Sequence, residues 1–221
     1  MQIAVIDDYQ GLAKTRPDWS DLDKNITITF FENHIFGEDE VSKQLQDFDV
    51  ICAMRERTPF KKSQLQKLPK LKLLITSGMR NSSIDVITAN KLGIKVCGTP
   101  AFGRPTADLA WGLIISLARK IPMEDQNIRN GIWQESIGVG LKDKTIGIAG
   151  LGNIGSKMAK IAHAFEMKTI AWSQNLTEDK CVLNGVEKVT KNDLLRRSDF
   201  LTIHLVLSER THGIFGAQEL T

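Results

Sequence analysis

Short apolar segments alternate with polar stretches along the whole chain. Five segments in the first hundred residues are rich in Val, Ile, Leu and Phe and are bounded by polar or turn residues: 2–7, 25–31, 48–54, 71–77 and 93–98. The stretches between them, such as 38–46 (EDEVSKQLQ) and 83–93 (SIDVITANKLG), have helical composition, and Gly93 is a suitable helix stop. Strands and helices that alternate at this length predict an α/β fold, with parallel strands joined by crossover helices.

The alternation breaks at residues 98–106 (GTPAFGRPT), where glycine and proline cluster ahead of a long predicted helix that runs to Pro122. The helix is apolar on nearly every side from Leu109 to Ala118, so it must be covered by two layers of the protein or by a second subunit. We therefore expect a domain boundary near residue 100, which divides the chain into domains 1–100 and 101–221.

The second domain has the pattern of one βαβαβ unit. Its elements are a strand at 145–149, a helix at 153–165, a strand at 168–172, a helix at 191–197 and a strand at 199–206. A complete dinucleotide-binding fold contains two such units, one for each mononucleotide. The sequence thus predicts the first mononucleotide half of a Rossmann domain.

Residues 150–155 (GLGNIG) fit the pattern G-x-G-x-x-G, which is a weak signal by itself. Here the motif follows an apolar strand and opens an amphipathic helix, as a phosphate-binding turn does. Gly150 would make the tight turn, Gly152 would let the backbone approach a pyrophosphate, and Gly155 would let helix pack on strand. Unpaired N–H groups at the helix N-terminus would bind the phosphates. The alternative is a glycine-rich turn without a ligand, and the strand–turn–helix context favours the ligand.

The choice between NAD and NADP stays open. An acidic side chain for the adenosine ribose is expected about 20 residues after the motif, at the end of the next strand. That strand is followed by Ser173, Gln174 and Asn175, without a carboxylate. Serine tolerates a ribose hydroxyl or a 2′-phosphate, but no arginine lies nearby to favour the phosphate.

Four segments, with their order and spacing, carry a family resemblance: 78–85 (GMRNSSID), 105–119 (PTADLAWGLIISLAR), 141–162 (LKDKTIGIAGLGNIGSKMAKIA) and 198–216 (SDFLTIHLVLSERTHGIFG). With them the chain resembles the D-isomer-specific 2-hydroxyacid dehydrogenase family, which includes phosphoglycerate dehydrogenase and glyoxylate reductase. The resemblance implies a flavodoxin-like substrate domain joined to a Rossmann domain. It also implies an NAD(P)-dependent oxidoreductase that interconverts a 2-hydroxy acid and a 2-oxo acid by hydride transfer.

The resemblance also assigns site residues. Thr106 is expected at the nicotinamide end of the cofactor. The residues expected at the pyrophosphate are Gly150, Gly152, Asn153, Ile154 and Gly155, and those expected at the adenosine are Ser173, His204, Leu205 and Val206. Met79 and Arg80 occupy the loop that meets the substrate carboxylate in the family, and Arg55 follows a strand where the family also touches substrate. For both arginines a solvated surface charge is the alternative. The chain departs from the family at Arg80, where glycine is usual, and at Val206, where proline is usual.

The family's substrate-anchoring arginine, orienting glutamate and proton-transferring histidine lie beyond the position of Thr221, so we expect no catalytic residue within 1–221. The first domain would lack its C-terminal return segment, and this truncated chain alone should not turn over 2-hydroxy acids at a useful rate. His34, His163 and His212 are expected to be surface or helix histidines. A non-catalytic NAD(P)-binding or interaction protein, or a fragment of a broken gene, remains as an alternative.

Composition and charge limit the classes of molecule that the protein is expected to bind. Apolar residues make up 42% and charged residues 25% of the chain, as in ordinary globular proteins. The net charge of +3 is spread without a basic block, which argues against nucleic acid. No secretory signal or membrane span is predicted, and Cys52, Cys97 and Cys181 have no spacing that suits a metal. We expect a cytoplasmic homodimer with reduced thiols, acting on a small 2-hydroxy or 2-oxo acid.

Overall fold

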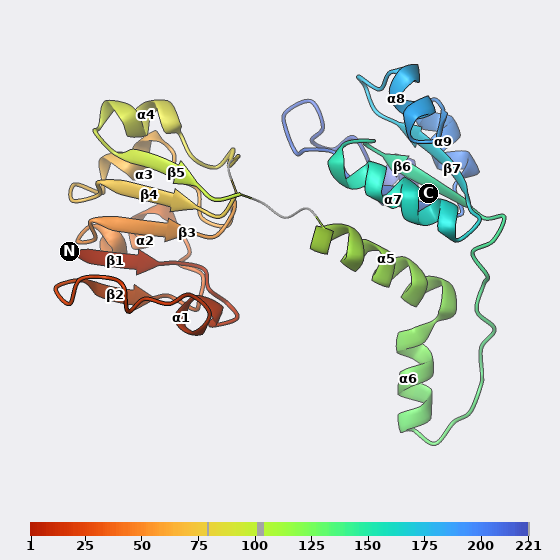
Figure 1. Cartoon of the computed structure of the whole chain (residues 1–221), viewed down its shortest axis with the longest axis horizontal. Helices are drawn as coiled ribbons and strands as arrows, with labels where there is room; N and C mark the ends of the chain where they lie inside the picture. The colour runs from red at the N-terminus through yellow and green to blue at the C-terminus, as the bar shows by residue number, and fades with distance from the viewer. Residues whose placement is uncertain (79, 101–103, 221) are drawn as a thin grey trace. The chain divides into compact units, whose positions relative to one another are not determined.

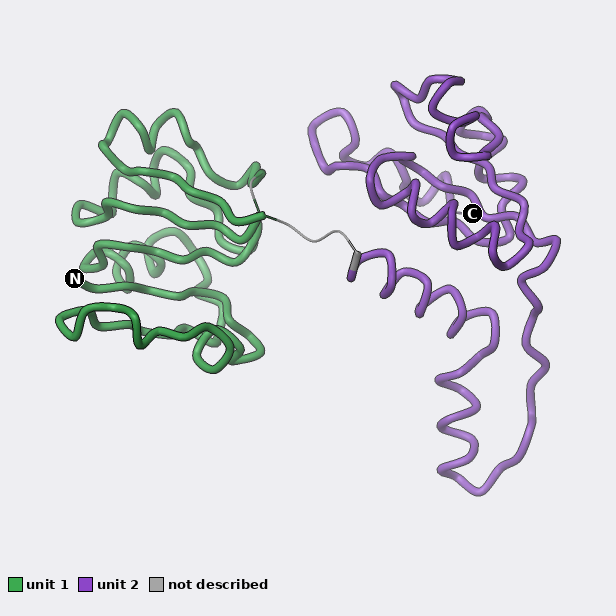
Figure 2. The backbone as a smooth tube through the Cα atoms, in the orientation of Figure 1, with its two compact units in different colours: residues 1–101 green, residues 102–221 purple. Residues whose placement is uncertain are grey.

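The computed structural model describes residues 1–78, 80–100 and 104–220. The chain forms two compact units, Met1–Ala101 and Phe102–Thr221, which are called the first and second unit below (Figure 2). The boundary expected near residue 100 adjoins residues 101–103, which lie outside the described residues.

The first unit is a parallel sheet flanked by short helices (Figure 1). Its strand order is β2-β1-β3-β4-β5, the flavodoxin-like doubly wound order. The strands are β1 (Gln2–Val5), β2 (Thr27–Phe30), β3 (Val50–Ala53), β4 (Leu73–Thr76) and β5 (Lys95–Gly98). The helices are α1 (Leu12–Thr15), α2 (Glu38–Leu45), α3 (Lys62–Gln66) and α4 (Val86–Lys91). The expected α/β class and flavodoxin-like fold are confirmed.

The core of this unit explains why its strands read as continuous apolar runs. Helices pack on the sheet, so that side chains of both faces are buried, and Ala4, Ile51 and Leu74 are fully enclosed. Helix α2 adds Val41 and Leu45 to the same core. The continuous apolar runs in the sequence therefore indicate strands of a parallel sheet that is buried on both faces.

The second unit contains a smaller parallel sheet of order β8-β7-β6-β9. This corresponds to strands 3-2-1-4 of the doubly wound dinucleotide fold, so the Rossmann-type fold is confirmed. The predicted βαβαβ unit took the strand at 199–206 as its third strand, whereas in the structure it is the fourth, which opens the second mononucleotide half. The strands are β6 (Thr145–Ala149), β7 (Lys168–Trp172), β8 (Glu187–Lys188) and β9 (Phe200–Ile203). The helices that follow them are α7 (Asn153–Ala164), α8 (Glu178–Leu183), α9 (Lys191–Arg197) and α10 (Ala217–Leu220). The sequence prediction missed α8 and β8, and it extended β9 to 206, beyond its end at Ile203.

Two helices open the second unit, α5 (Arg104–Arg119) and α6 (Ile121–Arg129). The predicted helix was expected to end near Pro122, but it ends before Lys120, which adopts a left-handed backbone with φ of 54°, and Pro122 lies in the first turn of a second helix. One face of α5 packs on α7, where Trp111 stacks on Phe165 with ring centroids 5.2 Å apart. None of the helices in the described parts of the chain is both long and apolar enough to cross a bilayer.

The opposite face of α5 is exposed within the described chain. Leu109, Leu113 and Leu117 recur at every fourth position and are 66%, 62% and 72% exposed. The expectation that this helix is covered on all sides therefore holds for one face, and the leucine stripe has no cover from the described residues.

Candidate functional site

The glycine motif forms the turn between β6 and α7. Gly150 has a φ of 97°, a backbone that L side chains rarely adopt, and a Cβ there would lie 2.9 Å from the carbonyl of His204. Its N–H donates to the Trp172 carbonyl over 2.8 Å. A Cβ on Gly155 would collide with the Gly150 carbonyl oxygen. These two glycines allow the helix to begin directly against the strand.

Gly152 differs from its neighbours, because a Cβ there would meet no atom within 4 Å. The structure of this chain does not need glycine at the position for packing. The open space instead lies beside the N-terminus of α7, where a ligand can come close to the backbone. This is the arrangement that a pyrophosphate requires.

The first turn of α7 presents free donors to this space. Gly152 is the N-cap and has no side chain to accept a hydrogen bond, and its carbonyl accepts only the N–H of Ser156. The N–H groups of Asn153, Ile154 and Gly155 find no hydrogen-bond partner among the described residues. Free N–H groups and the helix dipole together favour an anion.

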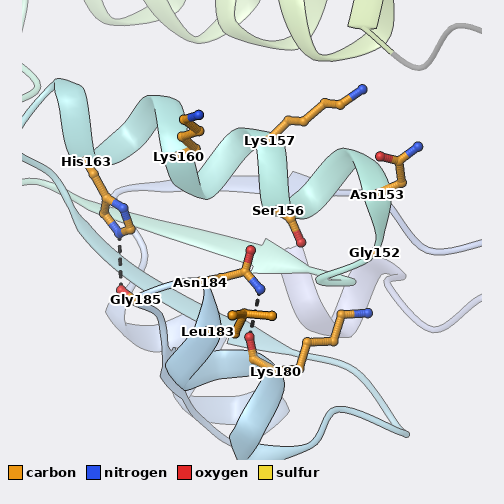
Figure 3. Close-up of a pocket in the computed structure, with 10 residues that line it drawn as sticks. All are labelled: Gly152, Asn153, Ser156, Lys157, Lys160, His163, Lys180, Leu183, Asn184 and Gly185. Carbon is orange, nitrogen blue, oxygen red and sulfur yellow. Dashed lines mark hydrogen bonds between the residues drawn. The ribbon is translucent and has the colours of Figure 1, made fainter.

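A hollow of about 780 Å³ extends from this turn along α7 toward α8 (Figure 3). Its charged lining residues are Lys157, Lys160 and Lys180, and no carboxylate lines it. His163 lies at its far end, where Nε2 is 3.1 Å from the Gly185 carbonyl oxygen and 3.0 Å from Thr169 Oγ1. His163 thus links α7 to the loop before β8, and it lies on a helix, as the sequence predicted.

A second pocket of about 250 Å³ lies at the carboxyl ends of β7 and β9. It brings together Ser173, which follows β7, with Leu205 and Val206, which follow β9. These are three of the residues expected at the adenosine. The segment after β9 lines one side of the pocket; the remaining lining residues are Trp172, Gln174, Asn175, Ser208, Arg210, Thr211 and Ile214.

The other expected cofactor residues line neither cavity; they are Gly150, Ile154 and Gly155 of the glycine turn, His204 and Thr106. The N–H of His204 donates to the Ala149 carbonyl, and its imidazole Nε2 is 2.8 Å from Thr202 Oγ1. Burial lowers the pKa of the His204 imidazole, which favours the neutral form. His204 therefore supports the turn behind Gly150. Thr106 is exposed in the first turn of α5 and lines neither cavity.

The expected substrate residues belong to the first unit. Arg55 follows β3, with its N–H donating to Ser77 Oγ over 3.0 Å and its guanidinium donating to the Ser77 carbonyl over 3.3 Å. Arg55 is thus held at the carboxyl edge of the sheet. Arg80 is exposed, and Met79 lies outside the described residues.

Sequence reasoning missed a buried polar cluster at the same edge. Asp7, 1% exposed and with a φ of 59°, follows β1. Its carboxylate accepts a hydrogen bond from Thr58 Oγ1 over 2.6 Å and lies 2.7 Å from His34 Nδ1. The guanidinium of Arg57 donates to the Asp7 carbonyl. The cluster joins the loops that follow β1, β2 and β3. The charged run at 55–58 (RERT) drew attention to the third loop in the sequence, but it did not indicate that Arg57 and Thr58 meet Asp7. No group of three or more potential metal ligands occurs in the described parts of the chain.

A strand–turn–helix with free amide donors, together with a pocket at the carboxyl ends of the neighbouring strands, is typical of a dinucleotide-binding fold. Comparisons with known proteins agree with this class. Residues 111–221 match the family model described as "D-isomer specific 2-hydroxyacid dehydrogenase, NAD binding domain". The chain belongs to this family, and its cofactor is NAD or NADP.

Individual relatives support the same assignment. A glyoxylate reductase from Thermococcus litoralis is 37% identical over 169 residues, which cover 72% of this chain and 51% of that protein. A D-3-phosphoglycerate dehydrogenase from Methanocaldococcus jannaschii is 33% identical over 187 residues, 83% of this chain and 36% of that protein. A phosphoglycerate oxidoreductase structure from Vibrio cholerae superposes with a TM-score of 0.91 at 30% identity, covering all of this chain and 71% of that one. The chain spans about half the length of the curated relatives it matches.

Proposed function

We propose that the protein is an NAD(P)-dependent oxidoreductase that interconverts a 2-hydroxy acid and a 2-oxo acid. The single observation that carries the proposal is the open side of Gly152 beside the free donors of α7, in a chain of this family. Residues 101–221 would bind the dinucleotide, and residues 1–100 would contact the substrate. The bound cofactor would supply or accept the hydride.

The residues of this chain would position that cofactor. The backbone N–H groups of Asn153 and Ile154 would bind the pyrophosphate, because no other partner among the described residues takes them. Ser173 would meet the adenosine ribose between the apolar walls of Leu205 and Val206, and Thr106 the nicotinamide end. Arg55 and Arg80 would supply positive charge for a substrate carboxylate.

The test measures cofactor binding and turnover separately. The 221-residue chain is titrated with NADH and NADPH, and we expect it to bind at least one of them. The chain, and the longer product if its gene continues past the codon for Thr221, are then incubated with a panel of 2-oxo acids while absorbance of the reduced cofactor is followed. We expect turnover from such a longer gene product and none at a useful rate from the chain alone.

The outcomes separate the proposal from its alternatives. Turnover by the chain near one per second would contradict the expectation for residues 1–221, because some histidine here would then be the acid. Cofactor binding without turnover by the gene product would favour a non-catalytic NAD(P)-binding protein. Absence of cofactor binding would overturn the proposed site altogether.

We also propose that the protein is a homodimer through the leucine stripe of α5. An exposed stripe of three leucines, with Trp133 75% and Ile137 90% exposed in the same unit, forms apolar surface that a monomer seldom leaves in water. Leu113→Asp is expected to shift the protein to monomers in light scattering, since it would bury a charge in the interface. The matched variant Leu183→Asp, at an exposed position of α8, should stay dimeric. A wild-type monomer at high concentration would refute the dimer.

We place the protein in the cytoplasm with reduced thiols. Cys52 and Cys97 are both paired with Ile75 across β4, so their Cα atoms are about two strand spacings, roughly 9.6 Å, apart. This is beyond the reach of a disulfide. Burial raises the pKa of the Cys52 and Cys181 thiols, which keeps them protonated and unreactive. An intramolecular disulfide in freshly isolated protein would count against this placement.

A further inference from the structure

The pocket behind Ser173 has an arginine that the sequence does not place there. Arg210 is 37 positions away along the chain, yet both residues line the same pocket. The parallel pairing of β6 with β7 and with β9 accounts for this, since the carboxyl ends of β7 and β9 meet at one edge of the sheet. The conclusion that no arginine stands near Ser173 is therefore wrong in three dimensions.

The segment that carries Arg210 is held in place by its own hydrogen bonds. Thr211 Oγ1 donates to the Val206 carbonyl over 2.6 Å and accepts from the Ser208 N–H over 2.8 Å. The Arg210 carbonyl accepts a hydrogen bond from Gln174 Nε2 over 3.5 Å, which links the segment to the end of β7. The backbone of Arg210 thus has a defined position beside Ser173.

The formal charge of the residues that line this pocket is positive. None of its lining residues carries a carboxylate, and Arg210 is the cation among them. Among the described residues, the hydrogen bond from Gln174 to the Arg210 carbonyl engages the backbone of Arg210, and its guanidinium has no ion pair or hydrogen bond. A pocket that binds an unmodified adenosine ribose usually offers an acid to the 2′-hydroxyl, whereas a pocket for the 2′-phosphate offers an arginine.

We infer that this pocket binds the 2′-phosphate of NADP(H), with Arg210 and Ser173 as its specificity-determining residues. The inference rests on the proposed function, because it assumes that the adenosine half of the cofactor occupies this pocket. The planar guanidinium can donate two parallel hydrogen bonds to a phosphate, and the serine hydroxyl adds a third donor. With no acid in the lining, nothing opposes the added negative charge.

Nucleotide fragments test this without any turnover. The 221-residue chain is titrated by calorimetry with adenosine 2′,5′-bisphosphate and with 5′-AMP, which differ only in the 2′-phosphate. We expect the bisphosphate to bind at least about tenfold more tightly. Arg210→Ala should weaken bisphosphate binding about tenfold to a hundredfold and change 5′-AMP binding less than about twofold, since only the phosphate contact is lost. Arg210→Lys should fall between, because an ammonium keeps the charge and loses the paired donors.

Arg196→Ala is the matched control, because Arg196 is an exposed arginine of α9 that lines neither cavity. It removes the same charge from the unit and should leave both affinities unchanged. Equal affinity of the wild type for the two nucleotides, or an Arg210→Ala variant that binds the bisphosphate as the wild type does, would overturn the inference while leaving the cofactor site in place. Binding of neither nucleotide would overturn the proposed cofactor site, and the inference with it.

Discussion

Replacing Gly152 with valine is expected to weaken NAD(P)H binding by at least about a hundredfold while the protein stays folded. The valine side chain would occupy the open space beside the α7 N-terminus and keep a pyrophosphate from the N–H groups of Asn153 and Ile154. Loss of two hydrogen bonds to a charged ligand, each worth about 1.5–3 kcal/mol, accounts for an effect of this size. Fluorescence titration with NADH and NADPH measures it.

The fold should tolerate this substitution, because a Cβ on Gly152 meets no atom within 4 Å and its φ of −85° suits any residue. We expect the free energy of unfolding to fall by no more than about 1 kcal/mol, the difference between glycine and a poor N-cap residue. Gly140→Val is the matched control, since Gly140 also has open space and lines neither cavity. Undiminished cofactor binding by the Gly152→Val protein would show that the cofactor does not approach this turn.

Replacing Gly155 with valine is expected to destabilise the second unit by about 3 kcal/mol or more. The new Cβ would collide with the Gly150 carbonyl oxygen and lie 3.1 Å from Ile148 Cγ2. Helix α7 cannot move away at low cost, because Met158 and Ala162 are fully buried on its other turns. The lost free energy should appear as a lower midpoint in urea unfolding.

Tryptophan fluorescence can follow this unfolding, since Trp111, Trp133 and Trp172 belong to the second unit and Trp19 alone to the first. Gly155→Ala should be destabilised in the same direction by a smaller amount, because alanine brings the colliding Cβ without the two methyl groups of valine. An unchanged midpoint for Gly155→Val would contradict the close packing of α7 on β6.

The elements that sequence predicted best are those buried on both faces. Strands β6 and β7 occur where the apolar runs at 145–149 and 168–172 placed them, and each run is continuous because helices or loops cover both sides. The turn at 150–155 was equally predictable, because its glycines are required by the local backbone: Gly150 has a positive φ, and Gly155 lies against the Gly150 carbonyl. The class of fold follows from these two signals together.

The elements that the sequence did not predict, β8, α8 and α6, have few buried side chains. Strand β8 has two residues, Glu187 and Lys188, both exposed at the edge of the sheet. Helix α8 buries only Cys181, and α6 buries no residue among the described chain. Apolar periodicity cannot predict an element without a buried face.

The parts of the site that sequence missed depend on tertiary contacts. Arg210 reaches the pocket of Ser173 through sheet pairing between strands far apart in the chain. Asp7 meets His34 and Thr58 for the same reason, at the carboxyl edge of the other sheet. Local patterns identify a phosphate-binding turn, whereas the side chains that select the ligand come together only in the folded sheet.

The function proposed for this protein depends on a dinucleotide held by the second unit at the Gly150–Gly155 turn. The most direct measurement is a crystal structure of the protein grown with NADPH. We expect the pyrophosphate within hydrogen-bond distance of the Asn153 and Ile154 N–H groups, and the adenosine between Ser173 and Leu205. Cofactor bound elsewhere on the chain, with the space beside Gly152 filled only by water, would contradict it.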